Sequence, residues 1–277
     1  FTYLHLAADK NLTETLAATG ATCIAYETIK VNGHLPLLEP MSEIAGRMSA
    51  LVGGYHLAKH TNGRGILLGG VPGVAPGRVV VIGGGTAGVN AARVAKGIGA
   101  DVTILEVDFD RMRFLDITME GARTVFSTEA NLRELLPRVD LVIGAVLVPG
   151  AAAPKLINRK MLRLMQPGSV FVDIAVDQGG CSETTRATTH EEPTYIEEGV
   201  VHYCVANMPG AYSRTATQAL NNVTHSWTAL IAEAGVKEAC AKREQLAGGI
   251  NCMAGKVTCE PVAEAHGMDY VDPITLL

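Results

Sequence analysis

The chain of 277 residues is long enough for one large domain or two of ordinary size. Hydrophobic residues make up 48% of it and charged residues 18%, which excludes a disordered chain because there is ample apolar surface to bury. The formal net charge is −5 and no basic run exceeds two residues, which argues against a nucleic-acid or anionic-membrane surface. The longest uncharged apolar stretch, Leu141–Pro154, is too short to span a bilayer. These features are typical of a soluble, globular protein.

The cysteines indicate a reducing environment. None of the six belongs to a C-x-x-C pair or to a spacing typical of zinc sites, so reduced and mostly buried thiols of a cytoplasmic protein are expected. No cluster of His, Asp and Glu has metal-ligand spacing either, and no metal site is predicted. The chain begins at Phe1 inside an apolar, strand-like run, Phe1–Ala8, and we expect it to lack the N-terminal part of a longer protein.

The first strong helical periodicity covers residues 40–60. Its apolar stripe consists of Ile44, Met48, Leu51, Val52 and Tyr55. A connection rich in glycine and proline follows over residues 69–77, and then a continuous β-branched run, Val79–Ile82, predicts a strand of a buried parallel sheet.

Strands and helices then alternate along the chain. Further strands are predicted at residues 102–107, 141–148, 170–176 and 202–206, with helical segments between them. This order is typical of a doubly wound α/β sheet of the Rossmann type. The chain turns helical again from Arg214, with Gly235 as a C-cap. We therefore expect a dinucleotide-binding domain over residues 39–213. A second α/β domain, for substrate, is expected to form from residues 1–38 and 214–277 and to be incomplete here.

A glycine-rich loop follows the strand Val79–Ile82 and opens a predicted helix. Gly83, Gly85 and Gly88 have the G-x-G-x-x-G spacing of dinucleotide-binding loops. The first glycine permits the tight turn, the second lets a pyrophosphate approach the backbone, and the third lets helix and strand pack closely. Glu106 ends the next strand, where a carboxylate binds ribose hydroxyls and repels a 2′-phosphate. NAD binding is therefore predicted; the alternative is a plain strand–turn–helix with an exposed glutamate.

Other polar residues are candidates with alternatives that the sequence leaves open. Asp177 follows a predicted strand at the edge where ligands bind in open α/β sheets, but an aspartate there can also cap a turn. Asp173 is predicted to lie mid-strand as a structural carboxylate. Asn207 ends the last strand and can meet a nicotinamide or begin a turn. His5, in an apolar run, is either an acid/base group or a satisfied core histidine.

Several separate strings resemble those of the alanine dehydrogenase family, which also includes the transhydrogenase alpha subunit. The strings occupy residues 1–7, 40–47, 69–74, 140–150, 173–180 and 205–209. The resemblance extends over essentially the whole chain, so it is far more specific than the glycine loop alone.

The resemblance implies an enzyme that interconverts L-alanine with pyruvate and ammonia and uses NAD. It makes His5 the proton carrier that contacts substrate, and it makes Asp177 the support of the reacting water or ammonia. It also implies a homohexamer. The cofactor site that it implies consists of Ser42, Gly83, Gly85, Thr86, Ala87, Gly88, Glu106, Val146, Leu147, Asp177, Asn207 and Met208.

Family members are expected to carry further N-terminal residues, including an arginine and a lysine that hold the substrate carboxylate. Neither position exists in this chain, so we expect it to bind NAD better than it catalyses. One alternative is a transhydrogenase-type NAD(H)-binding component, but such relatives tend to have glutamate at the position of Asp177. The other is a non-catalytic NAD-sensing module, against which the retained His5 and Asp177 argue.

Overall fold

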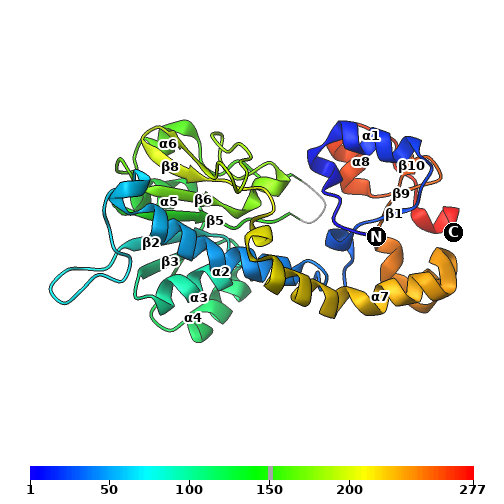
Figure 1. Ribbon diagram of the computed structural model, residues 1–277, viewed down its shortest axis with the longest axis horizontal. Coiled ribbons are helices and arrows are strands. Elements are labelled where there is room, and N and C mark those ends of the chain that lie inside the picture. The colour runs from blue at the N-terminus through cyan, green and yellow to red at the C-terminus, as the bar shows by residue number, and fades with distance from the viewer. Residues whose placement is uncertain (149–151) are drawn as a thin grey trace. The chain divides into compact units, whose positions relative to one another are not determined.

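The computed structural model describes residues 1–148 and 152–277, and the chain divides into two compact units (Figure 1). One unit contains Ser42–Leu147 and Ala153–Ala211; the other contains Phe1–Met41 and Tyr212–Leu277. None of the helices in the described part of the chain is long and apolar enough to cross a membrane. The last two residues of the string 140–150, Pro149 and Gly150, lie outside the described residues.

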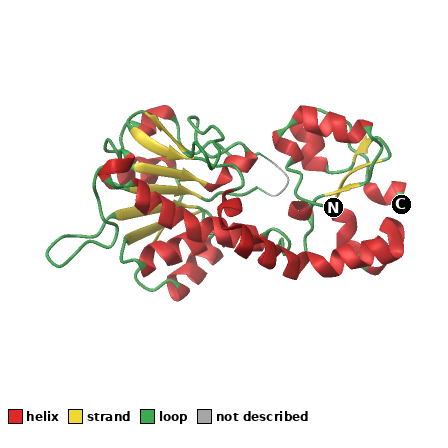
Figure 2. Cartoon of the chain, in the orientation of Figure 1, coloured by secondary structure: helices red, strands yellow, loops and turns green. Residues whose placement is uncertain are grey.

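A twisted sheet forms the centre of the first unit (Figure 2). Seven strands of the described chain join in the order β4-β3-β2-β5-β6-β8-β7. All neighbours pair in parallel except the edge strand β7, which is antiparallel to β8. The strands are β2 Arg78–Ile82, β3 Asp101–Glu106, β4 Arg123–Phe126, β5 Leu141–Gly144, β6 Val170–Asp173, β7 Thr194–Glu197 and β8 Val200–Tyr203. The predicted Rossmann-type sheet is confirmed.

Helices cover both faces of this sheet, and successive residues of β2 point to opposite faces. Val79 and Val81 pack into one core with α2 and α3, whereas Val80 and Ile82 pack into the other with α5 and α6. A strand buried on both faces has to be apolar at every position, which explains the continuous β-branched run. The helices are α2 Glu39–His56, α3 Thr86–Gly97, α4 Phe109–Thr118, α5 Glu129–Leu135 and α6 Arg159–Leu162.

The apolar stripe predicted for α2 is wrong at two positions. Leu51 and Tyr55 are 47% and 58% exposed, and the helix instead buries a face that includes small residues. A Cβ on Gly46 would lie 2.2 Å from the Ala87 carbonyl oxygen, and one on Gly53 would lie 2.5 Å from the Leu141 side chain. The helix therefore packs through glycines, which hydrophobic periodicity does not detect.

Strand ends also differ from the prediction. β5 ends at Gly144, before the expected Val148, and β6 ends at Asp173 instead of residue 176. Residues Ile174–Gln178 form a short 3-10 helix, η5, so Asp173 lies at the end of its strand and not in the middle. The strands β4 and β7 are absent from the sequence-based prediction, because both are short and only partly buried.

The second unit joins the two ends of the chain. Strand β9 pairs antiparallel with β1 and β10 in a small sheet. The helix α7 is interrupted at Gly235, whose φ of 74° is left-handed, at the position predicted as a C-cap. The elements are α1 Lys10–Ala18, β1 Cys23–Ile24, α7 Ser213–Lys242, β9 Ile250–Met253, β10 Lys256–Val257 and α8 Glu260–His266. The function of each unit stays a prediction.

Candidate functional site

The glycine loop connects β2 to α3 at the point where the strand order of the sheet reverses. The next strand in the chain, β3, pairs with one side of β2. The later strand β5 pairs with the other side of β2. In open α/β sheets this switch point is where ligands bind. Gly83, with φ of 98°, lies against β5: a Cβ there would be 2.8 Å from the Ala145 carbonyl oxygen. A left-handed φ and a close approach both require glycine at this position.

The other two glycines of the motif have different surroundings. A Cβ on Gly88 would lie 1.8 Å from the Gly83 carbonyl oxygen, so only glycine lets α3 approach the loop. By contrast, no atom lies within 4 Å of a Cβ built on Gly85. Gly85 is the N-cap of α3 and supplies no side-chain cap, so no N-cap side chain bonds to the N–H groups of the first turn, which begins at Thr86. This is a cradle for an anionic group at a helix N-terminus.

Glu106 at the end of β3 lies directly beside this loop. Its Oε2 accepts the Gly84 N–H at 2.8 Å, and its Oε1 accepts the N–H groups of Val107 at 2.7 Å and Asp108 at 3.1 Å. The carboxylate is half-buried and held by backbone donors. The structure thus brings the predicted acidic residue to the predicted loop.

A neighbouring arginine was not predicted from the sequence. The Nε of Arg111, in α4, donates to the Gly84 carbonyl oxygen at 2.6 Å, which places a guanidinium beside the loop and Glu106. Its position five residues after Glu106, in the first turn of the next helix, is the signal that could have indicated it.

The helix α2 contributes a second polar contact near the start of α3. The Nε of Arg47 donates to Asn90 Oδ1 at 3.0 Å, and Asn90 Nδ2 donates to the Thr86 carbonyl oxygen at 2.9 Å. Ser42 lies in the same helix and is half-buried. Arg47 and Asn90 were not among the predicted site residues, although Arg47 belongs to the string 40–47.

Asp177 and Asn207 meet at the carboxyl edge of β6 and β8, which are neighbours in the sheet. The Asn207 N–H donates to Asp177 Oδ1 at 3.0 Å, and Asn207 itself has a left-handed φ of 52°. Met208 beside it is buried, whereas Leu147, after β5, is 44% exposed and Val146 is half-buried. The described residues predicted for this unit therefore lie at the carboxyl ends of its strands, on the first turn of α3 or on α2.

Asp173 anchors the turn that carries Asp177. Its fully buried carboxylate accepts the N–H groups of Ala175 at 3.0 Å and Cys181 at 2.8 Å, and the Thr185 hydroxyl at 2.5 Å. These partners lie before and after the turn, so one side chain ties both of its ends. Burial raises the pKa of Asp173, and the hydrogen bonds to its carboxylate oppose that shift.

His5 belongs to the other unit and has a distinctive backbone. Its φ is 50°, and its N–H donates at 2.6 Å to Oε1 of Glu27, a buried glutamate that also accepts the Leu4 N–H. The Tyr3 ring stacks on the imidazole with centroids 5.9 Å apart. Among the described residues nothing bonds to the buried His5 Nδ1. Nδ1 of His5 thus lacks the hydrogen-bond partner that the buried ring nitrogen of a satisfied core histidine would have.

Comparisons with known proteins cover the whole chain. The model of the alanine dehydrogenase/PNT C-terminal domain matches residues 49–260, and that of the N-terminal domain matches residues 1–45. The chain belongs to the alanine dehydrogenase/PNT family. The resemblance recognised in the sequence is thereby confirmed.

Members of the alanine dehydrogenase/PNT family are similar over the full length of this chain. An alanine dehydrogenase of Halomonas elongata is 57% identical over 100% of this chain and 75% of that protein. One of Mycolicibacterium smegmatis is 52% identical with the same coverage. A solved L-alanine dehydrogenase is 47% identical, covers 96% of this chain and 74% of its own, and has a TM-score of 0.86. A transhydrogenase of Sinorhizobium meliloti, at 24% identity and a TM-score of 0.70, shares the fold.

The alanine dehydrogenase/PNT chain shows no grouping of His, Cys, Asp and Glu able to hold a metal ion in its described part. All six cysteines are free, and burial raises the pKa of Cys204 to about 12 and that of Cys181 well above its usual range. Thiols of this kind are poor nucleophiles because they stay protonated. The polar groups around the glycine loop, η5 and His5 are therefore the candidates for chemistry.

Proposed function

We propose that this chain is an NAD-dependent L-alanine dehydrogenase, which oxidises L-alanine to pyruvate and ammonia and runs the reaction in reverse. The observation that carries this proposal is the identity of 52–57% to alanine dehydrogenases over the whole chain. The alternative of a transhydrogenase-type component is disfavoured, because the solved transhydrogenase is only 24% identical to this chain.

The loop between β2 and α3 supports NAD as the cofactor. The open space over Gly85 and the N–H groups of the α3 first turn suit a pyrophosphate, which is anionic. Glu106, which accepts the Gly84 N–H, would accept hydrogen bonds from the ribose and repel a 2′-phosphate. When bound, NAD supplies the hydride acceptor that converts L-alanine into an iminium.

The remaining steps need proton transfer and a positioned water. Water adds to the iminium carbon and loses a proton, and the resulting carbinolamine breaks its C–N bond to release ammonia and form the pyruvate carbonyl. We assign the proton transfers to His5, since histidine is the side chain that most often acts as a general acid and base in enzymes. Asp177 would stabilise the cationic iminium and orient the water through its carboxylate. The Asn207 N–H holds one oxygen of that carboxylate.

The setting of His5 supports its role. The Glu27 carboxylate, which is 3% exposed, fixes the left-handed backbone at His5, and Tyr3 fixes the plane of the ring. A side chain held in this way loses little conformational entropy when it meets a substrate.

NADH absorbance tests the proposal directly. The 277-residue chain and the full translation product of its reading frame are assayed with L-alanine and either NAD or NADP. We expect NADH formation with NAD, and His5→Ala and Asp177→Asn should each lower kcat by about 10²–10⁴-fold. The matched controls are His225→Ala and Asp116→Asn, which change exposed residues of α7 and α4. Tight NAD binding without turnover in either protein would contradict the dehydrogenase and favour the NAD-sensing module.

We also propose that the protein is a homo-oligomer in the cytoplasm. Residues 66–77 form an arm that Leu68 anchors in the core and that extends away from the sheet (Figure 1); a bridge between Val71 and Val74 closes its tip. Leu67, Val71 and Val74 on the arm are 69%, 54% and 64% exposed, and apolar side chains gathered in this way favour association with a second copy. The six free cysteines, five of them buried, support a reducing compartment.

A further inference from the structure

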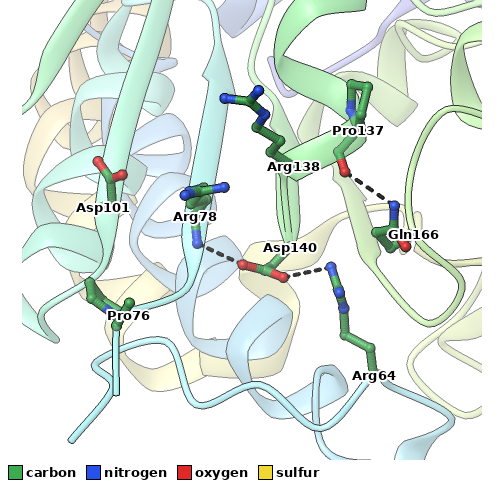
Figure 3. Close-up of a pocket in the computed structure, with 9 residues that line it drawn as sticks. Arg64, Pro76, Arg78, Asp101, Pro137, Arg138, Asp140 and Gln166 are labelled. Carbon is green, nitrogen blue, oxygen red and sulfur yellow. Dashed lines mark hydrogen bonds and ion pairs between the residues drawn. The ribbon is translucent and has the colours of Figure 1, made fainter. Parts of the chain in front are cut away.

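A polar cavity lies at the amino-terminal edge of the sheet, opposite the edge that carries the glycine loop. Arg78 is the first residue of β2, Asp101 is the first residue of β3, and Asp140 directly precedes β5. The cavity has a volume of about 380 Å³ (Figure 3). Its charged lining consists of Arg64, Arg78, Asp101, Arg138 and Asp140.

The two carboxylates of this cavity are already paired. Asp140 accepts the Arg64 guanidinium at 2.8 Å through one oxygen and the Arg78 backbone N–H at 2.8 Å through the other. Asp101 forms an ion pair with Arg123 at 3.0 Å. Each acid is thus neutralised by an arginine other than the two considered next.

The guanidiniums of Arg78 and Arg138 have no such partner among the described residues. Figure 3 shows the Arg78 side chain between Asp101 and Asp140, and the Arg138 side chain on the side of Asp140 away from Arg64. Both also line an adjoining cavity of about 230 Å³, together with Asp101. That second cavity adds Arg123 and Glu134, so four arginines face three acids across the two cavities. The two cavities therefore have one more positive than negative side chain, although the net charge of the protein is −5.

We propose that Arg78 and Arg138 form a binding site for a small phosphate-containing anion at the amino-terminal edge of the sheet. Guanidiniums present pairs of N–H donors that match the oxygens of phosphate, and two of them neutralise a dianion. The cavity volume, at the lower end of the range for small-molecule sites, suits a free phosphate, a pyrophosphate or the tail of a nucleotide. The site is separate from the cofactor cradle, because parallel strands present their amino and carboxyl ends at opposite edges.

Isothermal titration calorimetry with inorganic phosphate, pyrophosphate and ADP tests the site in the presence of saturating NAD, which occupies the glycine loop. We expect binding of at least one of the three by the wild-type protein, and its Kd should rise at least about tenfold in Arg78→Gln and in Arg138→Gln. The anion that binds most tightly of the three identifies the source of the phosphate group. Arg93→Gln, which removes an exposed arginine of α3 outside the cavity, should leave the Kd unchanged.

Three outcomes would overturn the site. These are no binding by any of the three anions, an equal Kd in the wild type and in both cavity variants, and an equal loss in Arg93→Gln. Both cavity arginines have exposed side chains, so the variants should fold; an unchanged melting temperature checks this, and Arg138→Lys provides a second variant that keeps the charge. A lysine retains the charge but not the paired donors, so its Kd should lie between those of wild type and Arg138→Gln.

Discussion

At the scale of single residues, buried polar groups hold the candidate site in place. Asp173 has no exposed surface and ties both ends of the turn at Asp177. The buried Glu27 accepts the adjacent N–H groups of Leu4 and His5 and so holds the backbone at His5. Neither effect is visible in the sequence, because each depends on backbone N–H groups that only the fold brings to the carboxylate. The sequence did predict Asp173 as a structural carboxylate, although it placed the residue mid-strand and not at the strand end.

Another buried residue links stability to pH. His202 in β8 is fully buried; its Nδ1 donates to the Val200 carbonyl oxygen and its Nε2 accepts from the Thr184 hydroxyl. Burial lowers the pKa of His202, so the folded state favours the neutral ring. The contribution of neutral His202 to the free energy of unfolding should therefore be fully present above a pH of about 6.5. It should be lost as the pH drops toward the lower pKa of the folded state.

Urea unfolding of the wild type, His202→Gln and His225→Gln at several pH values from about 7 to about 5 measures this linkage. We expect His202→Gln to be less stable near pH 7 but to lose less stability on acidification. The exposed His225 serves as the control and should keep the wild-type slope. Equal slopes in all three proteins would show that His202 does not carry the effect.

At the scale of elements, local patterns predicted the β2–loop–α3 segment because its requirements are local. A buried parallel strand needs an apolar run, and the turn into a helix needs glycine at fixed spacing. The same reasoning was wrong for the buried face of α2. That helix packs through Gly46 and Gly53 against α3 and β5, so Leu51 and Tyr55 are left exposed.

The glycine loop allows a paired experiment, since two of its glycines are needed for different reasons. Gly88→Ala puts a methyl group 1.8 Å from a backbone oxygen and should cost about 1–3 kcal/mol of stability through overpacking. Gly85→Ala meets no atom within 4 Å and should fold normally, yet its methyl group enters the space assigned to the pyrophosphate. We expect NAD to bind at least about tenfold more weakly to Gly85→Ala. Thermal melting and fluorescence titration separate the two effects, and an unchanged NAD Kd in Gly85→Ala would contradict the cofactor assignment.

At the scale of the whole molecule, the arm of residues 66–77 exposes apolar side chains that the packing of a single chain does not explain. Placing a charge on an apolar interface residue leaves that charge desolvated and unpaired. Leu67→Asp and Val74→Asp should therefore shift the protein toward the monomer, as measured by sedimentation or light scattering. Ile117→Asp changes an 82% exposed residue of α4 and should leave the mass of the assembly unchanged. A wild-type protein that is monomeric at micromolar concentration would contradict the homo-oligomer.

The residues alone predicted the parallel sheet, the glycine loop, Glu106 at the end of the neighbouring strand, and the family of the protein. Each of these depends on residues close together in the chain, where periodicity and spacing carry the information. The folded chain was needed to show that Asp177 accepts the Asn207 N–H, that Arg111 reaches the loop, and that Arg78 and Arg138 share a cavity. These contacts join segments that are distant in sequence, and their geometry follows from the order in which the strands pair.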